Sequence, residues 1–176
     1  MKRILLLTLL LCIISGTVFA QVYTNPQNVS ITVPDNWQMR KDYYSAEKNS
    51  YTTLLGDGKI QICELISVIN YNVPENATLD ILPDEKIINI ISSMFGKFAI
   101  SSDIKTKPNF KRITINGYPA IISDFTIVKN NISLSGRIYI TLKNSKLIGV
   151  YYMTMTDNMI TFLPVIEKSI NTLTVN

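Results

Sequence analysis

Alternation of apolar and polar residues runs through most of the chain and predicts β-strands. Residues 28–34 alternate up to a closing proline, and residues 132–143 alternate strictly over twelve positions. Residues 59–70 and 147–156 are instead apolar at both odd and even positions, which is typical of strands covered on both faces. The pattern therefore predicts a sheet whose central strands are buried between two layers.

Short turn sequences predict how these strands connect. Gly56-Asp57-Gly58 separates two apolar runs, and Asn116-Gly117 separates two more, the second being the strongest short hairpin signal in the chain. Asn130-Asn131 and Asn144-Ser145 flank the strand at 132–143. Consecutive hairpins of this kind predict an antiparallel meander over the second half of the chain.

One long helix is predicted midway along the chain. Pro83 suits the first helical position, and the two acidic residues that follow lie where the helix dipole favours negative charge. Apolar residues then recur at helical spacing from Ile87 to Phe98 and form one face. Either Gly96 or the segment after Phe98 is expected to end this helix.

A second helix is predicted near residue 170. Asp157 can cap it, and Phe162, Ile166 and Ile170 share one face. Since proline is disfavoured inside a helix, Pro164 places the expected start nearer residue 161. The elements together predict an α+β fold, an antiparallel β-sheet flanked by helices, with residues 21–176 as a single domain.

Residues 1–20 have the pattern of a secretory signal peptide. Lys2 and Arg3 precede an apolar run that is too short for a membrane span, and small residues end at Ala20, after which cleavage is expected. A lipid-anchored alternative would use Cys12, but Leu11 stands where such signals carry a small residue. We expect a secreted or periplasmic protein without a transmembrane span in its mature chain.

Composition excludes much of enzyme chemistry. The chain has no histidine, which removes the commonest general base and zinc ligand, and beyond the signal it has one cysteine, Cys63, expected to be buried and inert. Removal of Lys2 and Arg3 lowers the formal net charge from +4 to +2, with no basic cluster of the kind that nucleic acids need. We therefore expect no catalysis, no cofactor and no nucleic-acid partner.

The acidic residues that stand out in the sequence have ordinary structural explanations. Asp80, Asp84 and Glu85 form the densest group, and helix-dipole complementarity is favoured over a calcium site. Asp57 is explained by a tight hairpin, and Asp124 by an edge position or by pairing with Arg137 on a neighbouring strand. No metal site is predicted.

Four features in order resemble the PsbP-like superfamily, which includes bacterial DcrB-type envelope proteins. They are a strand running into VPDNW, the mid-chain helix, INGYPA opening a hairpin, and the final FLPVIEKSINTL helix. The resemblance implies an α/β/α sandwich around an antiparallel sheet and no shared catalytic residues. Its members are mostly accessory proteins, among them assembly factors, adaptors and periplasmic immunity proteins.

We therefore expect a non-enzymatic protein that acts by binding another protein in the cell envelope, as an adaptor, assembly factor or immunity protein. Tyr43 and Tyr44 are the candidate contact residues, since they follow charged residues in a polar stretch that looks like a loop, and loop aromatics are favoured at interfaces. The alternative is a module that binds a small molecule, lipid or metal in a cleft between sheet and helix.

Overall fold

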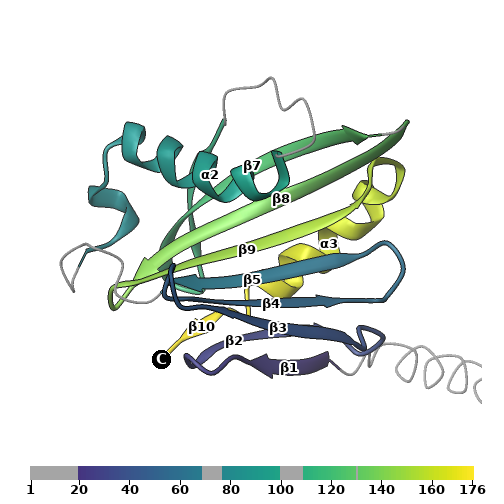
Figure 1. Cartoon of the computed structure of the whole chain (residues 1–176), viewed down its shortest axis with the longest axis horizontal. Helices are drawn as coiled ribbons and strands as arrows, with labels where there is room; N and C mark the ends of the chain where they lie inside the picture. The colour runs from purple at the N-terminus through teal and green to yellow at the C-terminus, as the bar shows by residue number, and fades with distance from the viewer. Residues whose placement is uncertain (1–19, 69–76, 100–108, 130) are drawn as a thin grey trace, which may run out of the picture.

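A seven-stranded antiparallel sheet forms the centre of the protein in a computed structural model (Figure 1), which describes residues 20–68, 77–99, 109–129 and 131–176. The expected signal peptide, apart from Ala20, lies outside these residues and stays a prediction. None of the helices in the described ranges is long and apolar enough to cross a membrane. In spatial order the strands are β3 (Met39–Ser45), β4 (Ser50–Gly56), β5 (Ile62–Val68), β9 (Lys146–Met155), β8 (Ile132–Lys143), β7 (Tyr118–Lys129) and β6 (Lys111–Ile115).

The predicted meander is confirmed. β7, β8 and β9 are consecutive antiparallel neighbours, and β6 joins β7 through Asn116-Gly117. The φ angles of Asn116 and Gly117 are +44° and +81°, and those of Asn144 and Ser145 are +51° and +55°. Paired positive φ values match the right-handed twist of the flanking strands, which explains why these dipeptides set the strand register.

A second, three-stranded sheet was not predicted. β2 (Val29–Pro34) lies between β1 (Ala20–Thr24) and β10 (Thr174–Val175), and both neighbours are antiparallel to it. β2 is the strand predicted at 28–34, but the sequence pattern had suggested that it belonged to a single sheet. The last strand of the sequence therefore pairs with the second.

Two α-helices pack on opposite faces of the large sheet. α2 (Asp84–Ala99) begins directly after Pro83, as predicted, and continues beyond Gly96. The short 3-10 helix η1 (Leu79–Ile81) precedes it. α2 lies along β7 and β8 on one side of the sheet in Figure 1, with α3 (Met159–Ile170) on the other.

The start of α3 differs from its prediction. Asp157 lies in the 3-10 helix η2 (Thr156–Asn158), and Asn158 is the residue that precedes the helix. Pro164 is accommodated in the helix interior. Pro164 has no N–H to donate to the backbone carbonyl of Ile160. Ile160 is 86% exposed, so water can take the place of this hydrogen bond.

The core consists of two apolar clusters, one on each face of the large sheet. Phe162 and Ile166 of α3 pack with β2 and with inward residues such as Tyr152, while Ile87 and Ile91 of α2 pack with residues such as Tyr151 on the other face. The predicted burial of both faces of β5 and β9 is confirmed. One outer layer combines α3 with the small sheet, so the protein is richer in sheet than the predicted helix-flanked α/β/α sandwich.

Candidate functional site

Tyr43 and Tyr44 lie in strand β3 and not in a loop, which corrects the interpretation of this polar stretch. β3 is the last strand of the large sheet and pairs only with β4 within the described residues. Tyr43 is 55% exposed and Tyr44 is 56% exposed. Since an edge strand keeps one row of backbone amide and carbonyl groups unpaired, this edge offers hydrogen-bonding groups and aromatic surface together.

The two tyrosines point to opposite faces of β3 because successive strand residues alternate. Tyr44 lies opposite Tyr51 of β4, and the two ring centroids are 4.7 Å apart. Tyr43 lies opposite Thr52 on the other face. The two rings therefore flank the open backbone edge and do not form one patch.

Asp42, on the same face of β3 as Tyr44, anchors the strand to the small sheet. Its carboxylate accepts hydrogen bonds from Tyr23 of β1 (3.0 Å), from Thr53 (2.7 Å) and from Arg40 (2.9 Å). Burial alone would raise the pKa of this carboxyl, but the hydrogen bonds from Thr53, Tyr23 and Arg40 outweigh it and hold the pKa below its usual value. The Arg40 guanidinium also lies 4.5 Å from the centroid of the Tyr23 ring.

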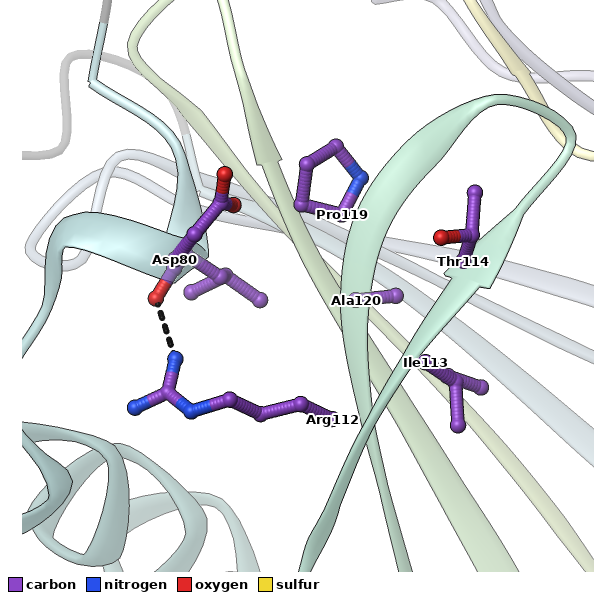
Figure 2. Close-up of a pocket in the computed structure, with 7 residues that line it drawn as sticks. Asp80, Arg112, Ile113, Thr114, Pro119 and Ala120 are labelled. Atoms are coloured by element: carbon purple, nitrogen blue, oxygen red, sulfur yellow. Dashed lines mark hydrogen bonds between the residues drawn. The ribbon is translucent and has the colours of Figure 1, made fainter.

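A cavity of about 320 Å³ lies beside β6, at the other edge of the large sheet (Figure 2). Arg112 donates to the backbone oxygens of Leu79 (2.8 Å) and Leu82 (3.1 Å) and to the Asp84 carboxylate (2.6 Å). Figure 2 shows the Asp80 carboxylate directed away from this guanidinium. Arg112 is thus engaged in fastening β6 to η1 and α2, and we assign no ligand to this cavity.

A second cavity, of about 340 Å³, lies between β2 and α3. Val33, Pro34 and Val165 contribute apolar walls, and Asn36, Gln61 and Lys168 are among its polar lining residues. Sequence reasoning missed these residues, because they come from β2, the turn after it, the β4–β5 loop and α3, and no local pattern connects them. We refer to this cavity as the β2–α3 cleft.

The carboxylates singled out in the sequence have structural partners. Asp124 accepts two hydrogen bonds from Arg137, at 2.6 and 3.1 Å, which confirms the cross-strand pairing predicted for it. Asp57 accepts from the backbone amides of the β4–β5 loop, as a tight turn requires. Asp84 pairs with Arg112, as described above. In the described ranges, no group of three metal-ligating side chains lies close enough together to hold a metal ion.

Cys63 is buried on β5, as predicted. Burial raises the pKa of its thiol to about 12, so the reactive thiolate is scarce near neutral pH. Cys63 is therefore not an activated nucleophile. Asp57, Asp84 and Asp124 are engaged in ion pairs or turn hydrogen bonds.

Comparison with known proteins identifies the fold. No family model matches the sequence, and no curated protein matches it. The solution structure of cyanobacterial PsbP (CyanoP) from Synechocystis sp. PCC 6803 is similar, with a TM-score of 0.67 and 14% identity over 92% of this chain and 95% of that one. A Bacteroides thetaiotaomicron protein has a TM-score of 0.54 and 12% identity over 89% of this chain, but over only 48% of its own length. The chain therefore has a PsbP-like fold, as its sequence resemblance predicted.

Proposed function

We propose that this protein works outside the cytoplasm as a non-enzymatic binding protein, and that it contacts another envelope protein through the open edge of its large sheet. The observation that carries this proposal is β3, an edge strand that pairs on one side only within the described residues and carries two exposed tyrosines on opposite sides of its backbone. Adaptor, assembly-factor and immunity roles all fit such a surface.

The physical basis is strand addition. An extended partner segment can satisfy the free backbone groups of β3 by continuing the sheet, and side-chain contacts on both faces then provide selectivity. Tyr43 and Tyr44 supply one aromatic contact on each face. Tyrosine is enriched among the residues that contribute most to interface affinity, because it buries a large rigid surface and keeps a polar group at its tip.

The ordering of β3 before binding also supports this role. Asp42 ties the strand to Tyr23 and Thr53, so the backbone edge is held in place without a partner. A pre-ordered edge loses less conformational entropy on association than a flexible loop would. The absence of histidine from the whole sequence and the burial of Cys63 favour binding over catalysis.

Site-specific photo-crosslinking in the native envelope tests the proposal. A photoreactive phenylalanine analogue at position 43 or 44 should form a discrete adduct with one protein, which mass spectrometry would identify. The matched control carries the analogue at Ile160, which is exposed on α3 far along the sequence. An adduct equally strong at position 160 would count against β3 as the contact surface.

A second step tests the contribution of the two rings. The double variant Tyr43→Ser, Tyr44→Ser should bind the identified partner at least about tenfold more weakly, since each lost interface tyrosine commonly costs more than 1 kcal/mol. Ile160→Ser removes comparable exposed apolar surface and should bind normally. Unchanged affinity of the double variant would overturn the assignment.

A further inference from the structure

We infer that the β2–α3 cleft binds a small amphiphilic carboxylate, with an apolar body between β2 and α3 and the carboxylate at Lys168. This inference is independent of the proposed protein-binding role, because the cleft and the β3 edge share no residue. It gives a location and a ligand class to the alternative function considered from the sequence.

The walls of the cleft suit an apolar body. Val33 and Pro34 of β2 and Val165 of α3 line the cleft, and the surface exposed inside it is mainly apolar. The volume of about 340 Å³ is at the lower end of the range of ligand pockets. At about 30 Å³ for a group the size of a water molecule, it accommodates a ligand of about ten non-hydrogen atoms.

Part of the polar lining is already satisfied within the protein. The Ser169 hydroxyl donates to the backbone oxygen of Thr32 and accepts from Tyr152. The Thr172 hydroxyl donates to the backbone oxygen of Ser169 and accepts from the backbone amide of Thr32. These groups hold α3 against β2 and leave little capacity for a ligand.

Three other polar groups remain available, and all three can donate. The indole N–H of Trp37 donates to Gln61 Oε1 at 3.3 Å, so the amide nitrogen of Gln61 is left for another partner. The side chains of Asn36 and Lys168 make no hydrogen bond or ion pair within the described chain. Two amides and an ammonium around an apolar cleft match an anionic, oxygen-bearing headgroup.

The charges around the cleft favour the same ligand. Among the residues that the structure describes, Lys168 is the one charged residue that lines the cleft, and none of the lining residues is a carboxylate. The adjacent Glu167 lies next to Arg137, 3.4 Å from its guanidinium, on the side of the β7–β8 ion pair. Lys168 is itself exposed, so its ammonium can pair with a carboxylate at the surface while the apolar body of the ligand lies in the cleft.

Titration of the mature chain with octanoate tests the inference. Octanoate has ten non-hydrogen atoms, and it should shift backbone amide resonances of residues 32–36, 61 and 165–172 in a saturable manner. Trp37, the only tryptophan, is hydrogen-bonded to a residue that lines the cleft, so its fluorescence gives a second readout. Shifts centred elsewhere, or no saturation below the micelle-forming concentration, would overturn the inference.

Two variants separate the headgroup site from the apolar walls. Lys168→Glu should weaken octanoate binding at least about tenfold and leave 1-octanol binding unchanged, whereas Lys86→Glu, at an exposed position on α2, should leave both unchanged. Val165→Phe, which fills the cleft, should weaken both ligands. Equal octanoate affinity in Lys168→Glu and the parent protein would contradict the proposed role of the lysine.

Discussion

The two edge strands of the seven-stranded sheet, β6 and β3, differ in how firmly neighbouring elements hold them. β6 has five residues, and Arg112 fastens it to η1 and α2 through two carbonyl oxygens and a carboxylate. The turn that follows β6 is also tied down, because Asn116 donates to the backbone oxygen of Leu173 at 2.8 Å. β3 has seven residues, and its side-chain anchor, Asp42, sits on one face of the strand and leaves the outer edge free.

This contrast indicates which edge of the sheet is open to a binding partner. Exposed strand edges promote unwanted association, and proteins usually shorten them, charge them or cover them. β6 is short, basic and bonded to a neighbouring element, so it follows that practice. β3 has charges at Arg40, Lys41 and Asp42 but ends in two exposed tyrosines, which fits an edge kept open for a chosen partner.

The largest expected effect concerns how far the open edge frays. Cys63 lies on β5, two strands inward from β3. If β3 is ordered without a partner, a thiol reagent at pH 8 should label Cys63 in a folded chain of residues 21–176 at least about 100-fold more slowly than in concentrated urea, because the thiol is buried and its pKa is raised. Fast labelling of the folded protein would show that the edge opens as far as β5.

The next prediction concerns β6, the edge strand that Arg112 fastens to η1 and α2. Arg112→Met should lower the free energy of unfolding by about 2 kcal/mol, since two carbonyls and a carboxylate lose a charged donor. Urea denaturation measures this change. Lys111→Met, at the exposed neighbouring position, should change it by less than about 0.5 kcal/mol. Equal losses in the free energy of unfolding of the two variants would show that Arg112 holds β6 no more firmly than an ordinary surface residue does.

A smaller effect separates the two tyrosines of the open edge. Tyr44→Ala should lower the free energy of unfolding by about 1 kcal/mol, because it removes the aromatic contact with Tyr51. Tyr43→Ala should cost less than about 0.5 kcal/mol, since Tyr43 has no comparable ring contact within the described chain. Thermal and urea unfolding of the single variants would check the order, and a larger loss for Tyr43→Ala would contradict it.

The smallest effect is a pH dependence of the Asp42 anchor. Its pKa is lowered in the folded state, so the folded protein holds this proton less tightly than the unfolded chain. The resulting stabilisation is present above the unfolded pKa of about 4 and is lost as the pH falls through the folded value. Asp42→Asn should therefore flatten the decline in stability below about pH 4. Asp35→Asn, in the exposed turn after β2, serves as the control for removal of one surface carboxylate.

Local sequence was sufficient where turns and periodicity act within a few residues. Asn116-Gly117 adopts the positive φ angles that its composition favours, Asn144-Ser145 adopts a similar pair, and the meander follows from these turns. Pro83 and its acidic neighbours correctly located the start of α2. The burial of both faces of β5 followed from its apolar residues at both odd and even positions.

The sequence did not predict elements whose apolar and polar pattern depends on their position in the fold. β3 resembles a loop because most of its residues are exposed on both faces, so no apolar alternation marks it. Once β3 is known to be a strand, alternation alone places Tyr43 and Tyr44 on opposite sides. The β2–α3 cleft could not be predicted, because its walls come from segments more than a hundred positions apart in the sequence.

The pairing of β10 with β2 has a consequence for the order of folding. β2 forms its two strand contacts with β1, just before it, and with β10, at the far end of the sequence. Loop closure over such a separation is slow and comes late, so the small sheet can be completed only after residues 174–175 have emerged from the ribosome. Until then Val29, Ile31 and Val33 lack part of their cover. The nascent protein is expected to expose this apolar surface to chaperones until β10 is available to pair with β2.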